Sequence, residues 1–96
     1  MELTDSDHQI VMEGIIQFLG MCTEEQRKAN MEVGRLIMNS RQINPMDIPM
    51  VRYMLQEVFK RYKEQWKACD ELACSGDLRL HYTEKLNGLN EVMQKI

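Results

Sequence analysis

The chain has 96 residues, of which 44% are hydrophobic and 28% are charged, and its formal net charge is −3. This composition is typical of a single globular domain spanning residues 1–96, because disordered chains are poorer in apolar residues and membrane proteins are much richer. The longest apolar stretch, residues 10–21, is interrupted by Glu13 and Gln17, is shorter than the ~20 residues that cross a bilayer, and lacks the basic flank of a signal peptide.

The first predicted element is a helix over residues 6–20, with Thr4 among its good N-capping residues. Apolar side chains surround most of its circumference and leave only a narrow polar line of Gln9, Glu13 and Gln17. A helix this apolar must be buried on several sides, and we expect a second copy of the chain to cover part of it in a symmetric homodimer. The predicted dimer interface consists of Ile10, Ile15, Ile16, Phe18 and Leu19.

A second helix is predicted over residues 24–39. We expect Gly20 to end the first helix, and Thr23 with Gln26 three residues later forms a capping box for the second. The apolar stripe of this helix is narrow and consists of Ala29, Val33, Leu36 and Ile37. We therefore expect a peripheral helix with most of its surface in water.

Two prolines four residues apart, Pro45 and Pro49, separate the second helix from the third. They predict a turn at Asn44-Pro45, a cap at Asp47 and a third helix over residues 48–73. At 1.5 Å per residue this helix would be roughly 37 Å long, more than the ~26 Å diameter of a domain this size, so it must bend or project. Its apolar stripe is the most regular pattern in the chain and consists of Val51, Met54, Leu55, Val58, Phe59, Tyr62, Trp66, Cys69, Leu72 and Ala73.

The pair Ser75-Gly76 breaks this pattern and predicts a short connection to a fourth helix over residues 77–95. So short a connection makes the third and fourth helices an antiparallel hairpin. We expect an all-α domain of four helices in which the first helix packs into this hairpin and the second lies outside.

Charge is distributed unevenly along the chain. Residues 1–26 hold six acids and no Lys or Arg, residues 27–67 hold nine bases and four acids, and residues 68–96 hold three bases and five acids. In the third helix, basic and polar residues follow one another at steps of four, four, three and four, opposite the apolar stripe. We call this surface the basic ridge: Arg52, Gln56, Lys60, Lys63 and Lys67. It is either a solvated helix face, a partner for the acidic first helix, or a binding face for an external acidic ligand.

Nine methionines are a second compositional feature, and Met46 and Met50 flank the proline turn. Flexible thioether side chains either fill irregular gaps in a small core or suit a surface that adapts to a partner. We expect Met46 and Met50 to belong to a contact loop beside the basic ridge. Trp66, the only tryptophan, is expected in the core.

The residues that carry chemistry form no recognisable catalytic or metal motif. His8 and His81 are not paired with an identifiable nucleophile. A metal site would need Cys69, Cys74 and His81, with or without Cys22 as a fourth ligand, but the Cys-x4-Cys spacing lacks the paired knuckles of a zinc motif. An odd number of cysteines also favours a reducing compartment. We expect a cytoplasmic protein that is not an enzyme, binds no metal or cofactor, and has no membrane partner.

The sequence favours a small regulatory protein, an adapter or inhibitor, that binds another protein of acidic or mixed charge through a helical face. The alternative is a dimeric, helix-turn-helix-like DNA-binding regulator. Against this alternative, the linker of about eight residues is longer than the turn of that motif. The bases also lie along the middle of the third helix, and the whole chain is acidic.

Overall fold

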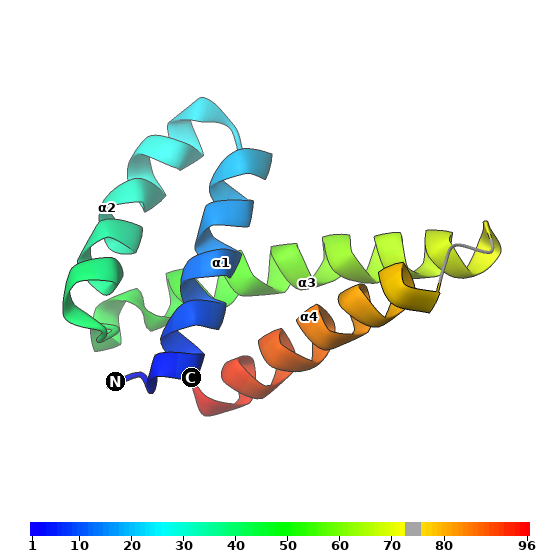
Figure 1. The fold of residues 1–96 in the computed structure, drawn as a ribbon. Coiled ribbons are helices and arrows are strands. Elements are labelled where there is room, and N and C mark those ends of the chain that lie inside the picture. Colours follow the sequence, from blue (N-terminus) through cyan, green and yellow to red (C-terminus); the bar gives the residue numbers. More distant parts are fainter. Residues whose placement is uncertain (73–75) are drawn as a thin grey trace.

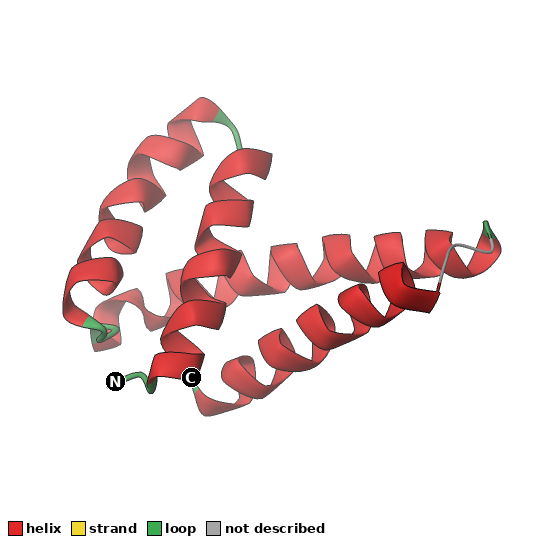
Figure 2. Ribbon diagram, in the orientation of Figure 1, coloured by secondary structure: helices red, strands yellow, loops and turns green. Residues whose placement is uncertain are grey.

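The computed structural model describes residues 1–72 and 76–96, and these residues fold almost entirely into helices (Figure 2). The α-helices are α1 (Asp5–Met21), α2 (Glu24–Ser40), α3 (Ile48–Glu71) and α4 (Gly76–Lys95), and a short 3-10 helix, η1 (Pro45–Asp47), precedes α3. The predicted all-α class and the predicted order of helices are confirmed. Over the same described residues, no helix is both long enough and apolar enough to cross a membrane.

Local hydrogen bonds explain where α1 and α2 begin and end. The Thr4 side chain accepts a hydrogen bond from the Asp7 N–H, and the predicted capping box between Thr23 and Gln26 forms in both directions. The prediction that Gly20 ends α1 is wrong by one residue. The Cys22 N–H still donates to the Phe18 carbonyl at 3.0 Å, so the helix continues to Met21.

The end of α2 brings the first residues of the chain into the fold. Arg41 caps α2 in the left-handed conformation, with φ 55°. The chain that follows pairs with the N-terminal segment, because the Leu3 N–H donates to the Arg41 carbonyl at 3.0 Å and the Ile43 N–H donates to the Met1 carbonyl at 2.8 Å. Leu3 and Ile43 are buried. This pairing was not predicted, because it is too short to produce an alternating pattern.

Helices α3 and α4 form the predicted antiparallel hairpin, and its far end projects beyond α1 and α2 (Figure 1). The molecule measures 41 × 30 × 18 Å, consistent with a long helix that extends past the rest of the domain. Trp66 holds this projecting part together: its indole N–H donates to the Thr83 hydroxyl at 3.0 Å, and the Arg79 guanidinium lies 4.8 Å from its ring centroid. Leu72 was predicted on the apolar stripe but is 76% exposed, and Ala73 lies outside the described residues.

The core lies where α1 crosses the hairpin (Figure 1). Gly14 allows this crossing, because a Cβ atom there would lie 2.4 Å from Leu55 Cδ2. Helix α2 packs mainly on α1, as expected for a peripheral helix. The largest fully buried side chains are Ile15, Ile37, Ile43, Met54, Leu55, Val11, Val51, Val58 and Val92.

Candidate functional site

The basic ridge lies along the exposed side of α3. All five of its residues, Arg52, Gln56, Lys60, Lys63 and Lys67, are exposed. At 1.5 Å per residue the ridge spans roughly 22 Å, about four helical turns. Lys60 Nζ lies 3.4 Å from a carboxylate oxygen of Glu57. Among the described residues, Arg52, Lys63 and Lys67 form no ion pair, so their charge is available to a ligand.

The acidic residues of α1 do not neutralise this ridge. Lys95 Nζ lies 3.1 Å from Asp7 Oδ1, Lys85 Nζ lies 2.7 Å from Glu13 Oε2, and Arg41 pairs with Asp5. The acids of α1 therefore meet bases of α4 and of the α2 cap. The structure therefore does not support the interpretation that the basic ridge is the partner of the acidic α1 in the same chain.

The methionines predicted to extend the ridge belong to a different surface. Met46 is 88% exposed in η1, and Met50 is exposed in the first turn of α3. Met50 and Arg52 are two residues apart, about 200° around the helix, so their side chains leave α3 on different sides. Met50 instead lies one turn before the exposed ring of Tyr53. The seven predicted partner-binding residues thus form two neighbouring surfaces.

The predicted dimer interface requires a correction. Ile15 is 0% exposed and Phe18 is 4% exposed within the single chain, so a second copy has no surface of either residue to cover. Ile10 and Leu19 are half-buried, and Ile16 is 61% exposed. The excess apolar surface of α1 is therefore covered mainly by the other helices. A homodimer stays a prediction, and the part of the predicted interface that remains accessible is the exposed edge of α1 around Ile16.

That exposed edge borders an apolar groove between α1 and α2, with a volume of about 190 Å³. Met12, Ile16 and Leu19 line it from α1, and Met31 and Met38 line it from α2. This groove was not predicted, because the expected contact surface included only the methionines beside the proline turn, Met46 and Met50. The spacing of seven residues between Met31 and Met38 places both on one side of α2 and was the available signal.

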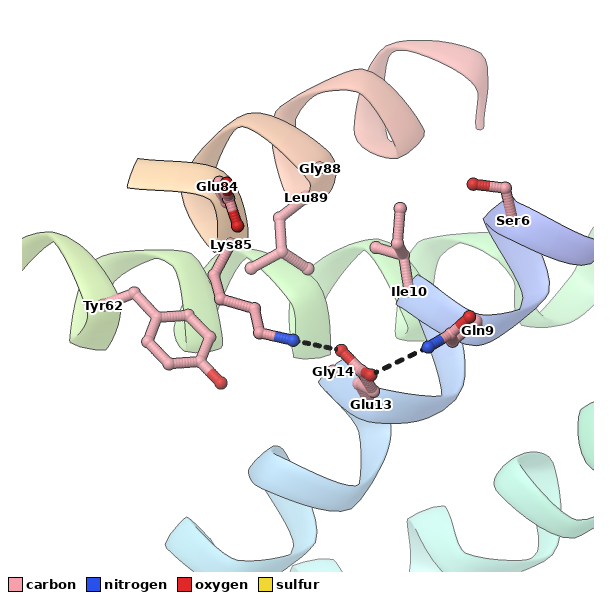
Figure 3. A pocket seen from close by; sticks show the side chains of 10 residues that line it. All are labelled: Ser6, Gln9, Ile10, Glu13, Gly14, Tyr62, Glu84, Lys85, Gly88 and Leu89. Atoms are coloured by element: carbon pink, nitrogen blue, oxygen red, sulfur yellow. Dashed lines mark hydrogen bonds and ion pairs between the residues drawn. The ribbon is translucent and has the colours of Figure 1, made fainter. Parts of the chain in front are cut away.

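A second hollow, of about 250 Å³, lies where α1, α3 and α4 meet (Figure 3). The side chains of Glu13 and Lys85 point toward each other across its opening, beside the ring of Tyr62, and Ile10 and Leu89 form part of its apolar wall. The hydrogen bond from Lys85 holds the pKa of Glu13 below its usual value, and the same bond raises the pKa of Lys85. Burial raises the pKa of Tyr62. Because the pKa of Glu13 is lowered and that of Lys85 is raised, both side chains are charged at neutral pH, and their ion pair connects α1 to α4.

Neither hollow is lined by His8, His81, Cys22 or Cys69. His8 Nε2 donates to the Ile37 carbonyl at 3.1 Å and so connects α1 to α2, whereas His81 is exposed beside Tyr82. Cys22 is half-buried, Cys69 is buried, and Cys74 lies outside the described residues. Within residues 1–72 and 76–96, no group of three or more His, Cys, Asp or Glu side chains is placed to hold a metal ion.

The architecture defines an all-α domain in which a peripheral helix and a projecting hairpin are both joined to one central helix, α1. Compared with known proteins, the chain matches no family model, no curated protein and no solved structure.

Proposed function

We propose that this protein is a small non-enzymatic regulator, an adapter or inhibitor, that binds another protein through the basic ridge of α3. The observation that carries the proposal is that Arg52, Lys63 and Lys67 are exposed and form no ion pair with residues 1–72 or 76–96. A row of bases on one rigid helix steers a partner of acidic or mixed charge and fixes its orientation. The exposed surface formed by Met46, Met50 and Tyr53 supplies an apolar contact beside the ridge.

The DNA-binding alternative has less support. A helix-turn-helix motif needs its two helices to pack against each other so that the second can enter the major groove. Here α2 packs on α1, and η1 and an extended segment separate it from α3. A protein partner also agrees better with the net charge of −3.

The test is affinity capture of the tagged protein from a lysate of its own cells at physiological salt, with and without nuclease. We expect one dominant protein that resists nuclease treatment. Its recovery should fall about tenfold or more for the triple variant Lys60→Glu, Lys63→Glu, Lys67→Glu, because three favourable charge contacts become repulsive.

A pair of single variants in α3 provides the matched control. Lys63→Glu and Arg61→Glu make the same change of charge two residues apart, and both side chains are exposed, but only Lys63 lies on the basic ridge. Recovery should fall for Lys63→Glu and stay unchanged for Arg61→Glu. Recovery that collapses with nuclease would favour the DNA-binding alternative, and equal losses for both single variants would argue against the ridge.

A further inference from the structure

The apolar groove between α1 and α2 has the shape and composition of a second docking surface, separate from the basic ridge. Its lining is almost entirely apolar, and Ile16, Met31 and Met38 are 61%, 42% and 55% exposed. An isolated exposed apolar side chain is ordinary, but three that gather along one groove are typical of an interaction site. Flexible methionines at such a site adapt to the side chains of a partner.

Gly34 sets the form of this groove. It lies three residues after Met31 and four before Met38, on the same side of α2, and a Cβ atom there would lie 3.0 Å from Ile15 Cγ2. The two helices therefore approach closely at Gly34, and longer side chains flank the approach. The result is a shallow apolar channel between two helices, the geometry into which a third amphipathic helix packs.

Charges on α2 indicate what kind of helix fits. Arg35 lines the groove three residues before Met38, and Lys28 lies one helical turn before Met31, beside the end of the groove. Both are exposed, and neither forms an ion pair with another described residue. They lie seven residues apart, roughly 10 Å along the helix axis. A helix with acidic side chains seven residues apart would match both bases.

A second copy of the chain matches this pattern poorly. In a two-fold arrangement that packs Met31 of one α2 against Met38 of the other, the axis passes between Gly34 and Arg35. The two Arg35 side chains would then meet at the axis, where like charges repel. This two-fold arrangement is therefore unfavourable, whereas a helix with acidic side chains beside its apolar stripe would complement both bases.

We propose that the groove between α1 and α2 binds an amphipathic helix of another protein, with apolar anchors one turn apart and acidic residues beside them. The protein then has two binding surfaces on different helices, the groove and the basic ridge. Two separate surfaces would allow one chain to hold two partners at once, which is what an adapter does.

The test uses two synthetic amphipathic helices of about 18 residues with the same leucine stripe. One carries glutamates seven residues apart beside the stripe, and the other carries lysines at those positions. Each labelled peptide is titrated with the full-length protein by fluorescence anisotropy. We expect the acidic peptide to bind at least about tenfold more tightly than the basic one, because two favourable contacts are replaced by two repulsive ones.

Two double variants with equal changes of charge identify the surface that binds. Lys28→Glu with Arg35→Glu should reverse the order of the two affinities, whereas Lys60→Glu with Lys63→Glu on the basic ridge should leave it unchanged. Ile16→Glu should abolish binding of the acidic peptide. Because Ile16 is exposed, this variant should keep the circular dichroism spectrum and the unfolding midpoint of the wild type.

Three results would overturn the proposal. The first is equal binding of the two peptides, or no binding of the acidic one up to about 1 mM. The second is a change in the order of the two peptide affinities for the Lys60→Glu, Lys63→Glu variant but not for the Lys28→Glu, Arg35→Glu variant. The third is a dimer in sedimentation of the protein alone that Ile16→Glu dissociates, which would show that a second copy fills the groove. The proposed function of the basic ridge is tested separately, by the recovery of the partner with Lys63→Glu and Arg61→Glu.

Discussion

At the scale of single residues, position on a helix decides what a side chain does more than its chemical type. Ile15 and Ile16 are adjacent and identical, yet one is fully buried and the other is 61% exposed. The same holds for lysines: Lys85 and Lys95 pair with acids of α1, whereas Lys63 and Lys67 remain exposed and unpaired among the described residues. Residue type alone could not separate the structural lysines from the available ones.

The Glu13–Lys85 pair should make stability depend on pH in a defined direction. Because the pKa of Glu13 is lowered on folding, its contribution is present above the unfolded pKa of about 4.3 and is lost as the pH falls through the folded value. Because the pKa of Lys85 is raised, its contribution is present below about 10.4 and is lost as the pH rises through the folded value.

We expect Lys85→Met to lower the free energy of unfolding by about 0.5–1 kcal/mol at pH 7, because solvent screens a pair whose side chains are 34% and 43% exposed. Urea unfolding at pH 7 and at pH 2.5 measures the difference, which should shrink at the lower pH. Lys60→Met, which removes an exposed pair on the surface of α3, is the control and should change stability little. A loss for Lys85→Met that stays equal at both pH values would show that packing, not charge, is responsible.

At the scale of elements, α1 is the helix that every other helix contacts. Helices α2, α3 and α4 all pack on it, and its buried residues Val11, Gly14, Ile15 and Phe18 face these neighbours. This explains why its apolar residues surround most of the circumference. A second copy was expected to cover part of this apolar surface, but three helices of the same chain cover most of it.

Two glycines of α1 should respond in opposite ways to the same substitution. Gly14→Ala would place a methyl group 2.4 Å from Leu55 Cδ2, and since Leu55 is fully buried we expect a net loss of about 1 kcal/mol after the gain in helix propensity. Gly20 has no atom within 4 Å of an added Cβ, so Gly20→Ala should raise stability by up to about 1 kcal/mol. Thermal and urea unfolding of both variants measure these changes. An equal gain for both would contradict the close crossing of α1 and α3.

At the scale of the whole molecule, the helices do not share a single compact bundle. Helix α2 packs on one side of α1, and the hairpin projects on the other (Figure 1). The two proposed binding surfaces belong to these two parts, the groove to α2 and the basic ridge to α3. A partner bound to one part would therefore leave the other accessible.

This arrangement predicts unequal protection of backbone amides. Helix α2 packs mainly on α1 at the periphery of the domain, whereas the first half of α3 holds Val51, Met54, Leu55 and Val58 in the core. In hydrogen exchange of the native protein, we expect amides of α2 to be protected at least about tenfold less than those of residues 51–58. Equal protection in the two regions would mean that the domain opens only as one unit.

The sequence alone determined the features that depend on neighbours within a few residues. The capping box at Thr23 and Gln26 and the regular apolar stripe of α3 involve contacts one turn apart, so their spacing in the chain is their spacing in space. The four helices and the antiparallel hairpin followed from these local signals. The spacing of seven residues that places Met31 and Met38 on one side of α2 is equally local.

Only the tertiary structure decided which surfaces are buried and which charges pair. Asp7 and Lys95 are 88 positions apart, and their contact depends on how α4 returns to the start of α1. Likewise, Ile15 is covered and Ile16 is not, because α2 approaches α1 from one side at Gly34. These outcomes depend on the crossing angles and approach distances between helices, which the periodicity along a single helix does not determine.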